Sequence, residues 1–293
     1  MTRTITISTS DGPVRYVAGN RLPHIPDAAN IKYVWEGYQG NGATLVCKTL
    51  PYKGNNQHWD REIAAIEAIN AARRLPNSLP GLNRIATYVT YGKDAEDATY
   101  GHIIMKDHGI PAKIVAEEID DAGLEEATRL ERRTRLVRAL VRDGLAAAVA
   151  LDFYGVYSRD LHPYNFLLPK DFDWDDPTAE PQLTVCDFSH SYFKDGPVAG
   201  SDNTTRGMEY VRPPGLLKER GAGGRQHNGL VDEAFSVAAA AYVTATGNAP
   251  YLLPDGMPVK PTITSRAQAN RWTLDIDSQL LHDSLSDDQL VDD

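Results

Sequence analysis

Two short strings of polar residues hold the side chains in this chain that are best suited to chemistry. Asp160 and Asn165 lie in the string Tyr157-Ser-Arg-Asp-Leu-His-Pro-Tyr-Asn-Phe-Leu-Leu, and Asp187 lies in Leu183-Thr-Val-Cys-Asp-Phe-Ser. Each polar loop stands beside apolar, strand-like residues, so the carboxylates and the amide can be held without being buried unpaired. Carboxylate and amide oxygens suit Mg²⁺, which commonly binds substrate phosphates as well. The pattern therefore indicates a site for Mg²⁺ and a phosphate group.

The elements around these strings divide the chain into a strand-rich part and a helix-rich part. β-Branched and aromatic residues predict strands in the first third, at residues 14–17, 31–35, 43–50, 85–91 and 100–105, with a turn at 39–42. Residues 106–111 are typical of a linker. Apolar periodicity predicts three helices, at residues 59–74, 125–153 and 231–246.

Two further expectations concern the helix-rich part. The helix at residues 125–153 is expected to present one broad apolar stripe, formed by Leu136, Val137, Leu140, Val141, Leu145 and Val149. The acidic stretch at residues 170–176, between the two polar strings, is expected to be solvated. A sheet followed by helices, joined by a hinge near residue 107, predicts an α+β fold.

Composition narrows the class of protein. The 293 residues are 42% apolar and 24% charged, which suffices for one large domain or two lobes with cores of their own. A formal charge of −10 argues against a nucleic-acid partner or an anionic membrane surface. Cys47 and Cys186 are too few and too far apart for a disulfide framework, which favours a reducing compartment. No signal-peptide or membrane-spanning run is visible, so we expect the cytoplasm, with the nucleus left open.

Several motifs, in the same order along the chain, resemble those of the protein-kinase-like superfamily. Arg159-Asp160-Leu161 together with Asn165 resembles the end of H-R-D-L-x-x-x-N, and Asp187-Phe188-Ser189 resembles D-F-G. Val46-Cys47-Lys48 resembles the end of V-A-I-K, and residues 61–63 resemble the start of the helix whose Glu pairs with that Lys.

The resemblance continues towards the C-terminus and extends over residues 14–251. Residues 207–214 resemble the end of a kinase activation segment. Residues 233–251 resemble the buried helix that anchors the catalytic loop, and Glu233 is expected to replace its usual Asp because Asp232 stands one position early.

The resemblance implies a two-lobed fold and an activity. The N-lobe, residues 1–106, would be a small antiparallel sheet with one helix. The C-lobe, residues 107–293, would be mainly helical with a shortened C-terminal end. The implied reaction is transfer of the γ-phosphate of ATP to a hydroxyl acceptor, with ATP and Mg²⁺ as the required small molecules.

The same resemblance assigns roles to individual residues. Lys48 would contact the α- and β-phosphates, and Glu62 would hold its ammonium in place. Asp160 would orient the acceptor hydroxyl and accept its proton, while Asn165 and Asp187 would bind Mg²⁺. Further residues expected at the nucleotide are Val46, Met105, Asp107 and His162, the last being either a phosphate contact or a residue that packs the loop.

Each of these side chains also has an ordinary structural interpretation. Lys48 on a strand can extend to solvent, and Glu62 can be an exposed helix residue. Ile66 and Ile69 share a helical face with Glu62, which favours an inward orientation. Asp160 and Asn165 are common in turns. Their order along one chain favours the functional interpretation.

The sequence also departs from the kinase pattern. Where a phosphate-covering G-x-G-x-x-G would stand, residues 21–30 contain two prolines and no glycine, and the glycines at 37–42 are better explained by a β-turn. Ser158, Ser189 and Gly215 replace the usual His, Gly and Glu of three motifs. The missing glycine loop motivates an alternative: a pseudokinase that acts as a nucleotide-binding or scaffold module with little phosphotransfer.

Within the kinase hypothesis the acceptor stays open. The activation-like segment and the buried helix slightly favour a protein Ser/Thr acceptor, whereas His162 and the short C-lobe favour a small molecule. Thr204 and Thr205 are either sites for an activating phosphate that pairs with Arg159 or ordinary loop residues. Zinc-ligand spacing, a serine-hydrolase elbow and a P-loop motif are all absent from the sequence.

Overall fold

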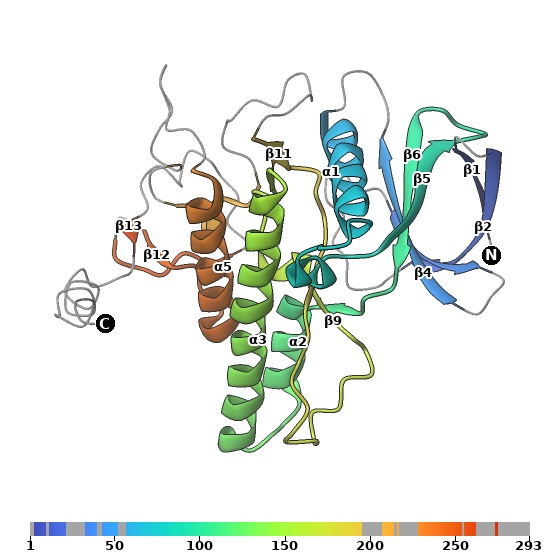
Figure 1. Ribbon diagram of the computed structural model, residues 1–293. Helices are drawn as coiled ribbons and strands as arrows, with labels where there is room; N and C mark the ends of the chain where they lie inside the picture. The colour runs from blue at the N-terminus through green and yellow to red at the C-terminus, as the bar shows by residue number, and fades with distance from the viewer. Residues whose placement is uncertain are drawn as a thin grey trace.

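The computed structural model describes residues 3–9, 12–21, 33–39, 43–51, 57–194, 207–213, 216, 228–253, 255–261 and 273–274. The fold is α+β, as expected, with strands in the first part of the chain and long helices in the second (Figure 1). Helix α1 (Gln57–Arg73) lies between the sheet and the other helices (Figure 1).

An antiparallel sheet closes on itself as a barrel in the order β1-β2-β3-β4-β6-β5. Its strands are β1 (Arg3–Thr9), β2 (Gly12–Arg21), β3 (Tyr33–Gln39), β4 (Ala43–Pro51), β5 (Tyr88–Asp94) and β6 (Tyr100–Lys106). The barrel closes where β1 meets β5, through the pairs Ile7 with Asp94 and Ser8 with Lys93. Strand β6 ends at Lys106, next to the predicted hinge.

Strand β1 was not predicted. Its Thr-Ile-Thr-Ile alternation turns Ile5 and Ile7 into the barrel, where they are 2% and 0% exposed. The strand predicted at residues 85–91 begins later, at Tyr88, because Ile85 leaves the sheet and bridges to Val185 instead. The predicted turn at residues 39–42 lies mostly outside the described residues.

Three long helices build the second part of the molecule: α2 (Ala112–Asp121), α3 (Glu126–Phe153) and α5 (Gly229–Thr246). Helix α3 packs along α5 (Figure 1). Short strands and turns lie beside them: β7 (Ile110–Pro111), β8 (Val156–Tyr157), β9 (Phe166–Leu168), β10 (Thr184–Val185), β11 (Tyr192–Phe193), β12 (Tyr251–Leu252), β13 (Thr273–Leu274), η1 (Pro80–Arg84), η2 (Pro163–Asn165) and η3 (Glu209–Val211).

The predicted linker, residues 106–111, is followed directly by α2, which was not predicted. The buried residues of α2 recur at i, i+3, i+4 and i+7, namely Ala112, Val115, Ala116 and Ile119. This apolar pattern spans only two turns and follows a proline, so the sequence alone does not distinguish it from a loop. Packing against the neighbouring helices buries it in the structure.

The predicted stripe on α3 was partly wrong. Leu136 and Leu140 are fully buried, but Leu145 and Val149 are 36% and 49% exposed. The buried face passes instead through Gly144, where a Cβ would lie 3.0 Å from both Phe166 Cε1 and a Val237 methyl. Helix α5 therefore approaches α3 closely at Gly144, and Leu145 and Val149 lie outside this buried face.

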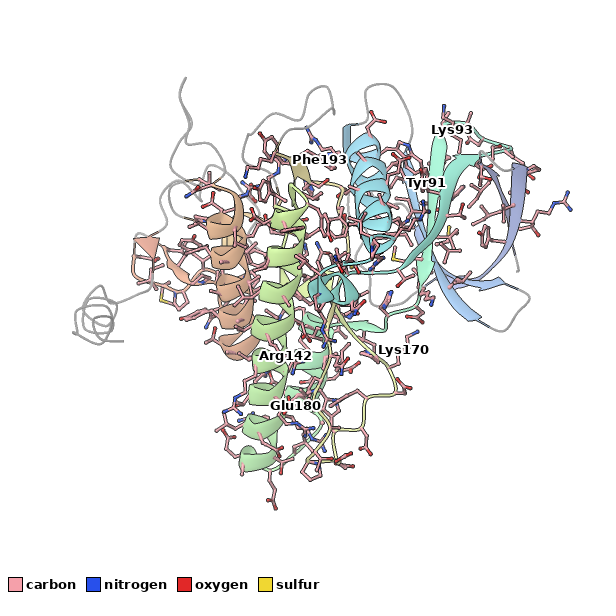
Figure 2. All side chains as sticks on the ribbon, in the orientation of Figure 1. Tyr91, Lys93, Arg142, Lys170, Glu180 and Phe193 are labelled. Carbon is pink, nitrogen blue, oxygen red and sulfur yellow. The ribbon has the colours of Figure 1, made fainter. Side chains whose placement is uncertain are left out.

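The acidic stretch between β9 and β10 is only partly solvated. Phe172 and Trp174 pack against the core, and the Arg135 guanidinium lies 5.7 Å from the centre of each ring. Arg142 Nη1 lies 3.5 Å from Glu180 Oε2. Figure 2 shows these two residues on the helical side of the molecule, and Tyr91 and Lys93 on the barrel. Helices of the described part are all too short or too polar to cross a lipid bilayer.

Candidate functional site

A buried cluster of three charged residues joins β4, α1 and the loop after β10. Lys48 is only 3% exposed, and its Nζ lies 2.8 Å and 2.7 Å from the two carboxylate oxygens of Glu62. The same Nζ lies 2.8 Å from Asp187 Oδ1. Because side chains alternate along a strand, Lys48 faces α1 while its neighbour Cys47 packs inside the barrel. Three segments far apart in sequence thus meet at one ammonium group.

Burial and mutual attraction set the ionisation of this cluster. Burial alone would lower the pKa of Lys48, but the Asp187 and Glu62 carboxylates raise it above its ordinary value. Burial raises the pKa of Glu62 to about 7, against the attraction of Lys48. Burial also opposes ionisation of Asp187, yet Lys48 and Ser189 hold the pKa of that carboxyl well below its usual range. Lys48 and Asp187 are therefore charged near pH 7.

The two polar strings contain the two non-glycine residues of the described chain with left-handed backbone. Arg159 has φ 60° and Asp187 has φ 65°. Such a conformation costs on the order of 1–3 kcal/mol and persists only where the surroundings hold it. The Arg159 guanidinium donates to the carbonyl oxygens of His190 at 2.8 Å and Ser191 at 3.3 Å, and it stacks on Tyr192. This arginine ties one strained loop to the other.

Asp160 is held from several sides in the loop that leads to η2. It is 6% exposed, and its Oδ1 accepts a hydrogen bond from the Met208 N–H at 2.8 Å. Its Oδ2 lies 3.6 Å from His162 Nε2 and 4.0 Å from His190 Nε2. Burial would raise the pKa of Asp160, but the two histidines lower it below its usual value. The carboxylate therefore stays ionised and oriented.

The buried helix α5 anchors the loop that contains Asp160. Glu233 is 1% exposed, and its carboxylate accepts the N–H groups of Ser158 at 3.1 Å and Arg159 at 2.8 Å. Asp232 is turned elsewhere and accepts the Asn228 N–H. Glu233 thus makes the anchoring contact that the sequence assigned to it. Above the loop, Gly207 leaves no room for a side chain, because a Cβ there would lie 2.2 Å from the Arg159 carbonyl oxygen.

Asn165 and Asp187 present oxygens of the kind that Mg²⁺ prefers. Asn165 donates its Nδ2 to the Asp160 carbonyl oxygen at 2.9 Å, which leaves its Oδ1 as the atom for a ligand. Asp187 uses Oδ1 for Lys48 and the Ser189 N–H, and we expect its Oδ2 to face a cation. No group of three or more His, Cys, Asp or Glu in the described part could hold a metal. The pair therefore fits a cation that completes its shell with phosphate and water, as Mg²⁺ does.

The four further residues expected at the nucleotide occupy different surroundings. Val46 and Met105 are cross-strand partners on β4 and β6 and belong to the main core. Asp107 accepts the Gly109 N–H with one oxygen and pairs with Lys170 through the other, each at 2.8 Å. His162 is buried between the rings of Tyr164 and Tyr210, and its Nδ1 accepts the Tyr164 N–H. Contacts of these four residues with a nucleotide stay predictions.

Two histidines at the site were missed by the sequence analysis. His58 lies one helical turn before Glu62 on α1, and His190 directly follows Asp187-Phe188-Ser189. The i, i+4 spacing of His58 and Glu62 on a predicted helix was a usable signal. Nothing in the sequence distinguishes His190 from a loop residue. The glycine-free stretch at 22–30, together with Thr204, Thr205 and Gly215, lies outside the described residues.

Comparison with known proteins places the chain in no family. No protein-family model matches it, and no curated protein is similar to it in sequence. The functional assignment therefore depends on the residues and their geometry.

Proposed function

We propose that this protein is an ATP-dependent phosphotransferase that transfers the γ-phosphate to a hydroxyl group. The observation that carries the proposal is the buried Lys48 ammonium held between the Glu62 and Asp187 carboxylates, at 2.7–2.8 Å. A lysine in that position can bind phosphate oxygens without the entropic cost of ordering its long side chain. The proposed fold is the two-lobed protein-kinase-like one. Its N-lobe is residues 1–106, which include the barrel and α1, and its C-lobe is residues 107–293.

In the proposed reaction, each polar residue has one task. Lys48, oriented by Glu62, donates to the phosphates of ATP. Asp160 Oδ2 accepts the hydrogen of the acceptor hydroxyl and orients its oxygen towards the γ-phosphorus. A new bond forms between that oxygen and phosphorus, the bond to the bridging oxygen of ADP breaks, and the hydroxyl proton passes to Asp160. Asn165 and Asp187 would hold Mg²⁺, which when bound would neutralise phosphate charge.

Geometry around Asp160 supports a hydroxyl of a protein chain over a small molecule. The backbone of residues 207–208 reaches the catalytic loop, since the Met208 N–H bonds to Asp160 at 2.8 Å. A segment fixed next to Asp160 in this way can present its other backbone groups to an extended peptide. His162, the residue that favoured a small-molecule acceptor, is packed among tyrosines.

The first experiment is a thermal-shift titration with ATP, with and without Mg²⁺. A ligand at a hundred times its Kd stabilises a protein by about 2.7 kcal/mol, which is readily measured. We expect a shift that is larger with Mg²⁺ in the wild type, and a loss of the Mg²⁺-dependent part in Asp187→Asn. Absence of any shift at millimolar ATP would overturn the proposal.

The second experiment measures transfer of labelled phosphate to Ser/Thr peptides and to small hydroxyl compounds. Asp160→Asn should lower the rate by about 10²- to 10⁴-fold, the usual contribution of a positioned acid–base group. The matched control is Asp171→Asn, which removes an exposed carboxylate of the acidic loop. ATP binding without transfer in the wild type would instead favour the nucleotide-binding module.

A further inference from the structure

Two hydrogen bonds join helix α1 to the segment that follows Asp187. His58 Nδ1 donates to the Ser189 carbonyl oxygen at 3.1 Å, and the Ser191 hydroxyl donates to the Arg61 carbonyl oxygen at 3.2 Å. One turn along the helix from His58, Glu62 holds the lysine that contacts Asp187. A displacement of α1 must therefore move the whole segment from Asp187 to Ser191.

The side chain of His190 bridges this segment and Asp160. Its ring meets the His58 ring edge to face, with centroids 4.8 Å apart and planes at 82°. On its other side, Nε2 lies 4.0 Å from Asp160 Oδ2. Its main chain is fixed as well, because Arg159 Nε donates to the His190 carbonyl oxygen at 2.8 Å. His190 thus contacts both α1 and the Asp160 carboxylate.

A buried imidazole at position 190 lowers the stability of the fold unless its ring nitrogens have polar contacts. His190 Nδ1 is buried and has no hydrogen-bond partner among the described residues. An unsatisfied buried polar atom costs about 1–3 kcal/mol, which an apolar ring of similar size would avoid. The Nε2 of the same ring lies 4.0 Å from Asp160 Oδ2, which is an electrostatic contact longer than a hydrogen bond.

The two oxygens of Asp160 have different neighbours in the described part of the chain. Oδ1 accepts the Met208 N–H, whereas Oδ2 lies beside two imidazoles, those of His162 and His190. His162 accepts the Tyr164 N–H with Nδ1, so its Nε2 carries the hydrogen and faces Asp160. His190, which directly follows the second polar string, supplies the other imidazole.

We propose that His190 is a positioning residue for Asp160, and that with His58 it couples the position of α1 to the acceptor side of the site. This inference rests on the proposed phosphotransferase function. The same helix then positions Lys48 through Glu62 and Asp160 through His58 and His190. A nucleotide that draws α1 into place also orients the group that receives the hydroxyl proton.

The test of the positioning role compares three replacements of His190. We expect His190→Ala and His190→Phe to lower kcat by about 10- to 100-fold, because a small displacement of a catalytic group costs that much, with KM for ATP changed less than about twofold. Phe keeps the packing on His58 but lacks the N–H. His190→Gln retains a donor near Nε2 and should recover most of the rate. A Phe variant as active as the wild type would overturn the proposal, and Lys194→Ala, an exposed change in the same segment, is the control.

The coupling to α1 is tested by a double-mutant cycle. His58→Ala should lower kcat in the same way, and the double variant His58→Ala/His190→Ala should be no slower than the slower single variant, because both act through Asp160. Multiplicative losses would show independent effects and would overturn the coupling.

A readout without phosphate transfer separates failure of the inference from failure of the proposed function. The histidine ring signals in the NMR spectrum are recorded for the wild type, Asp160→Asn and His58→Ala. Both changes should move the His190 signal and leave that of His102, in the barrel, in place. Unmoved His190 signals overturn the inference even in an active enzyme. Moved signals in a protein that transfers no phosphate support the contact and overturn only the proposed function.

Discussion

Strand β4 carries buried polar clusters on both of its faces, and the two clusters differ in charge balance and in backbone strain. On one face, Lys48 contacts Glu62 and Asp187 at the candidate site. On the other face, inside the barrel, Thr49 contacts His102, which in turn contacts Asp94. The two clusters lie one residue apart along the chain and face opposite surroundings.

In the barrel cluster, both ring nitrogens of His102 and both carboxylate oxygens of Asp94 have partners. His102 is 1% exposed, and its two ring nitrogens lie 2.9 Å from Thr49 Oγ1 and 2.8 Å from Asp94 Oδ2. The other oxygen of Asp94 accepts the N–H groups of Glu96 at 2.8 Å and Asp97 at 3.1 Å. Asp94 also stands where the barrel closes, opposite Ile7. A network of this kind, with every member paired, specifies one structure.

The cluster at the candidate site differs from the barrel cluster in its charge balance and its backbone strain. It sets one ammonium against two carboxylates, and Asp187 stands in a strained backbone conformation. Lys48 and Ser189 both contact the Asp187 carboxylate, but Lys48 alone faces two acidic groups. Buried groups with unbalanced charge and strained backbone are frequent at ligand sites, where the ligand supplies what is missing. The comparison teaches that charge balance and backbone strain, more than burial, distinguish the candidate site from a structural network.

The largest expected effect comes from removing the central cation. Lys48→Met leaves two carboxylates facing each other in a buried site, and breaking a buried ion pair in this way costs about 3–5 kcal/mol. We expect that loss in urea unfolding, together with loss of the ATP-induced thermal shift. Lys93→Met, an exposed lysine of β5, is the control and should change stability by less than about 0.5 kcal/mol. A fully stable Lys48→Met would mean that the cluster is not held as described.

A smaller effect is expected in the barrel. Asp94→Asn leaves His102 with a weaker partner and should cost about 1–3 kcal/mol of unfolding free energy. Phosphate transfer by the folded protein should not change, because the barrel cluster faces away from Lys48. Chemical unfolding and transfer assays on the same preparation check both points. A variant that folds normally but loses transfer would break the distinction between the two faces.

The smallest effect is a difference in how stability depends on pH. Burial opposes the ionisation of Asp94, but His102 and the neighbouring N–H groups lower its pKa below the ordinary 3.8. Its contribution is therefore present above pH 3.8 and is lost as the pH falls through the lowered value.

The contribution of Glu62 to folding stability depends on pH in the opposite direction. Its pKa is raised from 4.5 to about 7, so the folded state binds this proton more tightly. The stabilisation is complete below pH 4.5 and is lost as the pH rises through about 7. Unfolding of the wild type should thus become harder relative to Glu62→Gln between pH 8 and pH 5. A pH-independent difference between these two proteins would contradict the assignment.

The sequence predicted the α+β class and selected polar residues that the structure brings close together, while the functional roles of those residues stay predictions. Lys48, Glu62, Asp160 and Asp187 were found because each lies in a short motif whose order along the chain carries information. The three longest helices were found because their apolar periodicity extends over several turns. Glu233 was expected because Asp232 stands one position early for the Asp of the buried helix in the kinase pattern.

What the sequence could not predict depends on contacts between distant segments. Strand β1 is stabilised by closure of the barrel, and the four residues of its alternation are too few to show this. Exposure of Leu145 and Val149 is set by the close approach of α5 at Gly144, which no pattern within α3 reveals. The role of His190 arises only when the loop after β10 meets α1.

Strand β1 also has a practical consequence. It pairs with β2 along its whole length and with β5 at Ile7 and Ser8, so it covers two strands at once. Trimming residues 3–9 during protein production would open the barrel and leave rows of unpaired N–H and C=O groups on both neighbours. Exposed edges of this kind recruit strands from other molecules, so the shortened protein should aggregate or exchange β1 between copies.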